Sequence, residues 1–129
     1  MKSVLLGMLG AVVALVAAAM VYPQYSDYRA RAQTDSWLFT VEEVQRKVET
    51  NAERKRSLVG AGTGVERPKF LPSIAPEYFR VTNDGIIFVK GGRDGQLVVL
   101  MPSLSGSKIT WACIGGSLRT MPSRCQNVP

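Results

Sequence analysis

Apolar and polar positions divide the first half of the chain into two runs. The first, Val4–Tyr22, is apolar, and no charged residue stands between Ser3 and Ser26. As a helix this run measures about 28 Å, close to the thickness of the hydrocarbon core of a bilayer. We therefore predict an apolar, membrane-spanning helix over residues 1–22. Pro23 follows directly and lacks a backbone donor, so a kink or local loosening is expected there.

The second run is amphipathic. After Asp35 the apolar side chains recur at steps of three and four, at Leu38, Val41, Val44, Val48 and Ala52. This spacing is typical of a helix that buries one stripe and exposes charged faces. The helix is expected to continue to about residue 58 and to stop before the glycine-rich segment 60–64.

Short runs rich in β-branched and aromatic residues follow, and turn signals separate them. The predicted strands are Tyr78–Thr82, Ile86–Lys90, Gln96–Met101 and Lys108–Ile114. Their connections, which include Asn83-Asp84-Gly85 and Pro102–Gly106, are short, so neighbouring strands must be antiparallel. One face of this sheet, at about residues 78–114, would accept the helix stripe. Much of that core is expected to come from Ile86, Phe88, Val99 and Trp111.

These elements predict an α+β fold, with a long N-terminal helix packed on a four-stranded antiparallel sheet and a disulfide loop at residues 113–125. An apolar segment at 1–22 precedes one globular domain at 23–129. About 100 residues suffice for one hydrophobic core and not for two.

The composition argues against an enzyme. The chain has no histidine, so it lacks the most common general base and metal ligand. Glu42 and Glu43 are adjacent on a helix and point apart, and Asp84 and Asp94 stand in turn signals. No catalytic residue, metal site, cofactor or small-molecule substrate is predicted.

Cys113 and Cys125 are the 2 cysteines of the chain, and two thiols without histidine make a poor zinc site. Behind a membrane-targeting segment they are expected to form a disulfide in an oxidising compartment, such as a periplasm. The domain that carries them would then lie outside the cytoplasm.

The N-terminal segment admits two interpretations. Residues 1–22 could be a retained membrane anchor, because the apolar run is longer than a usual signal core. Lys2, the apolar run and Ala17-Ala18-Ala19 also fit a signal peptide cut after Ala19.

The net charge of +6 suits an anionic partner, although it also simply keeps a protein soluble. Arg54, Lys55 and Arg56 form a run, where they also complement the dipole at a helix end. Three further cations could gather near the disulfide loop: Lys108, Arg119 and Arg124. Phosphate contacts need cations and little sequence specificity, so DNA is the anionic partner considered.

The residues between the two runs resemble a type IV pilin of the IVa group. Members carry Pro-x-Tyr-x-x-Tyr-x-x-Arg-Ala/Ser where their helix leaves the membrane, and this chain has Pro23, Tyr25, Tyr28, Arg31 and Ala32 at those positions. The resemblance implies that these residues pack against neighbouring subunits.

The end of the chain is also similar to those pilins. Ile109-Thr110-Trp111 precedes Cys113, and Met121-Pro122 precedes Cys125, as in the tryptophan strand and disulfide loop of the family. The resemblance implies a non-enzymatic protein of a type IV pilus or related secretion system, in the bacterial inner membrane with its domain in the periplasm. Its partners would be pilin subunits or pilus assembly proteins.

The N-terminus departs from the family. Prepilins have a charged leader ending in glycine, followed by Phe-Thr-Leu-x-Glu, and counting back from Pro23 places Lys2 and Leu6 at the phenylalanine and the glutamate. A cut after Gly7 would leave too short a spanning segment. The departure argues against ordinary fibre incorporation, so the chain could be a minor subunit or a non-assembling relative. The alternative is a surface-exposed, pilin-like binding module for DNA or another anionic partner.

Overall fold

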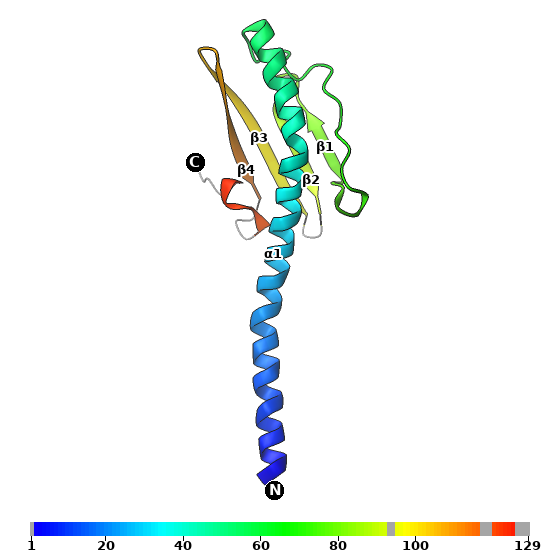
Figure 1. The fold of residues 1–129 in the computed structure, drawn as a ribbon, viewed down its shortest axis with the longest axis vertical. Helices are drawn as coiled ribbons and strands as arrows, with labels where there is room; N and C mark the ends of the chain where they lie inside the picture. Colours follow the sequence, from blue (N-terminus) through cyan, green and yellow to red (C-terminus); the bar gives the residue numbers. More distant parts are fainter. Residues whose placement is uncertain (1, 93–94, 117–119, 126–129) are drawn as a thin grey trace.

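The computed structural model describes residues 2–92, 95–116 and 120–125, without the side chains of residues 20–24. Helix α1, Lys2–Lys55, is a single helix of 54 residues. It is about 80 Å long and extends far beyond the small domain that packs on its second half (Figure 1). The helical backbone passes through Pro23 without a break, so the loosening expected there does not end the helix.

The predicted stripe on the helix is confirmed. Its apolar side chains are all buried: Leu38, Val41, Val44, Val48 and Ala52. Trp37, which extends the same stripe one turn towards the N-terminus, is fully buried as well. The steps of three and four therefore place one continuous face of α1 against the sheet.

The sheet is antiparallel and its four strands follow one another in chain order. They are β1 (Tyr78–Val81), β2 (Ile87–Gly91), β3 (Gln96–Ser105) and β4 (Lys108–Gly115). Figure 1 shows α1 crossing one face of this sheet. The predicted α+β fold and antiparallel meander are confirmed.

The predicted turn at Pro102–Gly106 is wrong. Strand β3 continues through Pro102 to Ser105, and the reversal lies between Ser105 and Lys108. Strand β2 pairs with β3 only as far as Leu100, so at Pro102 β3 has a partner on one side alone. A proline lacks a donor, and such a position tolerates it.

The predicted core face of the sheet is wrong for three of its four residues. Ile86, Phe88 and Val99 are only partly buried, and the residues of β2 and β3 that face α1 are their neighbours, at Ile87, Val89, Val98 and Leu100. Trp111 of β4 is also partly exposed, but it lies on the predicted face and packs against the buried core. Because side chains alternate across a strand, an error of one position reverses the assignment of the faces.

Helix α1 ends at Lys55, three residues before the expected position. The amide of Ser57 donates to the Ala52 carbonyl at 3.2 Å, and the amide of Arg56 donates to Glu53 at 3.4 Å. These two bonds form a Schellman motif, whose central residue adopts the left-handed conformation. Arg56 occupies it with φ 50°, where a side chain costs on the order of 1 kcal/mol relative to glycine.

The predicted disulfide between Cys113 and Cys125 is present, with the two Cα atoms 4.7 Å apart. It joins β4 to the short helix η3, Ser123–Cys125. Met121 and Cys125 are buried in the core with the residues of α1 and the sheet. A second short helix, η1 (Pro72–Ile74), lies in the connection between α1 and β1.

Candidate functional site

The N-terminal part of α1 is not covered by the domain. Its segment Lys2–Ala19 has a mean hydropathy of 2.1, and none of it is buried in the fold. By length and composition this helix could cross a membrane, and a signal sequence near an N-terminus would pass the same test. An apolar surface of this size is stable in water only when lipid or another protein covers it.

The motif that resembles pilins lies between the bare part of α1 and the domain. Tyr25 and Tyr28 are 56% and 67% exposed, and the guanidinium of Arg29 lies 5.8 Å from the centre of the Tyr25 ring. Arg31 is exposed, and its Nε donates to the Asp27 carbonyl at 3.4 Å. The side chain of Pro23 lies outside the described part. The side chains of Tyr25, Tyr28 and Arg31 are therefore exposed, at the point where the domain begins to cover α1.

A polar cluster attaches the domain to α1 at the point where the helix first becomes covered. Gln96 Nε2 donates to the Ala30 carbonyl and to the Thr34 hydroxyl, at 2.6 Å each. The Thr34 hydroxyl also lies 3.2 Å from the Thr120 carbonyl. Gln96 and Thr34 are both buried. The sequence does not predict this cluster, because its members are far apart along the chain.

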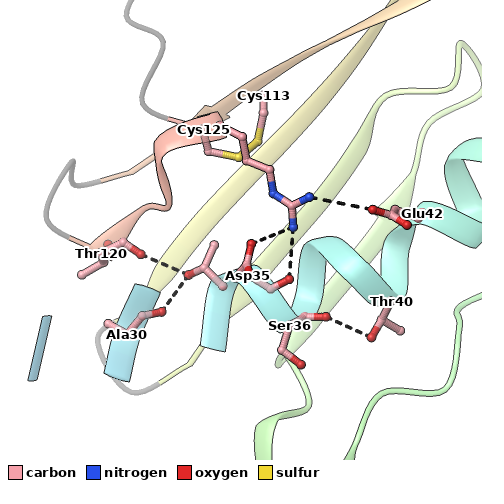
Figure 2. Close-up of polar contacts among 10 residues, drawn as sticks. Ala30, Asp35, Ser36, Thr40, Glu42, Cys113, Thr120 and Cys125 are labelled. Carbon is pink, nitrogen blue, oxygen red and sulfur yellow. Dashed lines mark hydrogen bonds and ion pairs between the residues drawn. A yellow bond between two sulfur atoms is a disulfide. The ribbon is translucent and has the colours of Figure 1, made fainter. Parts of the chain in front are cut away.

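Arg124 forms ion pairs with two side chains of α1. Its Nη2 lies 2.8 Å from Asp35 Oδ1 and 3.3 Å from the Asp35 carbonyl, and its Nη1 lies 3.8 Å from Glu42 Oε1. Figure 2 shows these contacts beside the disulfide of Cys113 and Cys125. Two carboxylates thus neutralise this cation, so it is not the free anion contact that the sequence predicted.

The other predicted cations lie in two different elements of the fold. Arg54, Lys55 and Arg56 are exposed at the end of α1, and Lys108 is exposed where β4 begins. A hollow of about 340 Å³ separates the helix end from the turn between β3 and β4, and Arg56 and Ser107 line it from opposite sides. Ile109 and Trp111 of β4 pack on the α1 side of the sheet, so Lys108 lies on the opposite face. Arg119 lies outside the described residues.

A hollow beside α1 has a volume of about 640 Å³. It lies between α1 and the loop before β1, and its polar lining includes Arg29, Gln33 and Glu77. Glu77 is its one carboxylate, and the described residues contain no cluster of three or more potential metal ligands. The absence of catalysis stays a prediction.

No family model, curated protein or solved structure matches the chain. The likeness to type IV pilins therefore rests on the chain's own residues, chiefly the stretch from Pro23 to Ala32 and the segment from Trp111 to Cys125.

Proposed function

We propose that this chain is a non-enzymatic, pilin-like accessory protein of a type IV pilus or a related secretion system. Residues 1–22 would hold it in the bacterial inner membrane, and the domain would lie in the periplasm. The disulfide agrees with this location, because such bonds persist in oxidising compartments. Its partners would be pilin subunits or pilus assembly proteins.

One observation supports the proposal above the others. The first part of α1 has no contact with the domain, whereas one face of its second half is buried against the sheet. Among the side chains of α1 that the structure describes, Ala30 is the first that the domain buries, at 2% exposure. Before it, Leu9 and Val13 are 68% and 62% exposed. A helix shared between a membrane and a small domain suits a protein that packs laterally against other helices. The Tyr25 and Tyr28 spacing adds the resemblance to pilins.

Two forms of the proposal differ in whether the chain enters a fibre. Pilins use a glutamate in the apolar run to meet a neighbour's terminal amine, whereas this chain has Leu6 at that position. An uncharged residue costs nothing in lipid, whereas an isolated carboxylate there is costly. A relative that docks on pilins in the membrane therefore fits better than a fibre subunit.

In-cell photo-cross-linking tests the partner class. A cross-linking amino acid at Leu9 or at Tyr28, both exposed on α1, is expected to yield adducts with a pilin subunit or an assembly protein, identified by mass spectrometry. The same amino acid at Ser103, which is exposed on the sheet, is the matched control and should yield fewer of them. Adducts at Leu9 and Tyr28 that contain only lipid, or only proteins unrelated to a pilus, would contradict the proposal.

A further inference from the structure

The face of the sheet that points away from α1 is apolar. Phe88, Val99 and Ile114 are cross-strand partners and form a row on it, across β2, β3 and β4. Leu97 and Met101 extend this row along β3, on either side of Val99. We call these five residues the outer patch. Each of them is at least partly exposed, and none packs against the buried core within the described part of the chain.

The two central strands have the sequence of a sheet that is covered on both faces. Residues 86–89 and 97–101 are apolar without interruption, whereas a strand with one face in water alternates between apolar and polar side chains. Helix α1 covers the inner face, where it packs on Ile87, Val89 and Val98. The outer face is therefore suited to a second packed layer.

The charges around the outer patch have one sign. The four strands contain three charged residues, Arg80, Lys90 and Lys108, and no carboxylate. All three are exposed and lie on the outer face, because the next residue or the preceding one in each strand packs on the core side. Arg80 pairs with Phe88 across the strands, and Lys90 pairs with Leu97. None of the three cations takes part in an ion pair in the described part of the chain.

The dimensions of the outer patch match one helix. Two strand spacings separate Phe88 from Ile114, which is about 10 Å, and an α-helix with its side chains is about 10–12 Å wide. From Leu97 to Met101 the patch extends for about 13 Å along β3, or about two and a half turns of a helix. Beyond Met101 this face becomes polar, at Ser103. A helix lying along β3 would bury an apolar stripe on the patch and place one flank beside the cations of β1 and β2.

We propose that the outer patch binds an acidic amphipathic helix of a partner protein. The apolar stripe of that helix packs across Phe88, Val99 and Ile114, and carboxylates on one flank pair with Arg80 and Lys90. A second copy of this chain fits less well, because two outer faces in contact would oppose like charges. The strands run lengthwise beside α1, so the outer face does not point towards a membrane that α1 spans (Figure 1). The inference does not depend on whether the partner belongs to a pilus.

The test uses the full-length protein in phosphatidylcholine nanodiscs and a fluorescent designed helix of about five turns. This acidic peptide has a stripe of leucines at steps of three and four, flanked by glutamates. Fluorescence anisotropy is expected to show saturable binding above the background of empty nanodiscs. A peptide with lysines in place of the glutamates should bind at least about tenfold more weakly. A permuted peptide of the same composition without the leucine stripe should also bind at least about tenfold more weakly.

Two double variants separate the apolar and charged parts of the outer face. The apolar variant, Phe88→Thr with Val99→Thr, should weaken binding of the acidic peptide at least about tenfold. It should keep a cooperative thermal transition, because threonine suits a strand and neither side chain belongs to the buried core. The charge variant, Arg80→Glu with Lys90→Glu, should reverse the preference, so that the lysine peptide binds more tightly than the acidic one.

Arg46→Glu with Arg54→Glu is the charge-matched control, since both side chains are exposed on α1, and it should keep the wild-type affinity within about twofold. The proposal fails if wild type does not bind the acidic peptide, if the lysine peptide binds as tightly, or if the control loses as much affinity as the charge variant. Dimerisation of wild type that the apolar variant abolishes, measured by sedimentation in detergent, would assign the outer patch to a second copy and overturn the proposal. Co-flotation of the nanodiscs with phosphatidylglycerol vesicles, lost in the apolar variant, would assign it to a membrane and overturn the proposal as well.

Discussion

Trp37→Ala is expected to lower the free energy of unfolding by about 4 kcal/mol, within the range measured for removing a large aromatic side chain from a core. Trp37 is fully buried, and its indole Nε1–H donates to the Ile74 carbonyl. The substitution therefore opens a cavity beside Val41 and leaves a carbonyl without its partner. Because Ile74 belongs to the loop between α1 and β1, that loop would also lose its attachment to the helix.

Urea unfolding of the full-length protein in detergent measures this effect, and the fluorescence of Trp111 reports on the domain in the variant. Trp37→Phe keeps most of the buried ring and loses only the donor, so it should cost about 1–2 kcal/mol. Trp111→Ala should cost less than Trp37→Ala, because Trp111 is partly exposed and its Nε1 bonds to Glu49 Oε1 at 2.7 Å. A larger loss from Trp111→Ala would contradict the assignment of the core.

Replacing both cysteines, Cys113→Ser with Cys125→Ser, is expected to cost about 3 kcal/mol, as the chain-entropy model gives for a loop of about a dozen residues. Cys125 is 2% exposed and lies in the core with Met121. Without the bond, the loop is held by Met121 and by the contacts of Arg124 with Asp35 and Glu42. Surface ion pairs of this kind contribute at most about 1 kcal/mol, so they cannot replace the disulfide.

Thermal unfolding with and without a reductant measures the contribution of the disulfide. The reductant should lower the midpoint of wild type and leave that of the double variant unchanged. Equal midpoints for oxidised wild type and the double variant would contradict the predicted contribution of the bond.

The helix was predictable because one period describes its whole buried face. The steps from Leu38 to Ala52 identified the stripe, and Trp37 could have been added because it precedes Val41 by four residues. The meander was predictable from its turn signals. Element type and order follow from local pattern, which one sequence contains.

The faces of the sheet were not predictable in the same way. Ile86, Ile87, Phe88 and Val89 are apolar in succession, so alternation does not distinguish the inner from the outer face. The structure resolves this ambiguity by burying Ile87 and Val89.

The contacts between distant segments were also beyond local pattern. Gln96 meets Thr34 across 62 positions, and Arg124 meets Asp35 across 89. No local signal marks such partners. For the same reason, the sequence did not show that Arg124 pairs with Asp35 and Glu42 of α1.

The central claim is that residues 1–22 stay on the mature protein as its membrane anchor. The intact mass of the protein, purified from the membranes of its native host, tests this claim most directly. The account predicts the mass of the chain with its apolar segment, close to 14.1 kDa, in the membrane fraction. A mass lower by residues 1–19, found in the soluble periplasmic fraction, would contradict the claim and identify the segment as a cleaved signal.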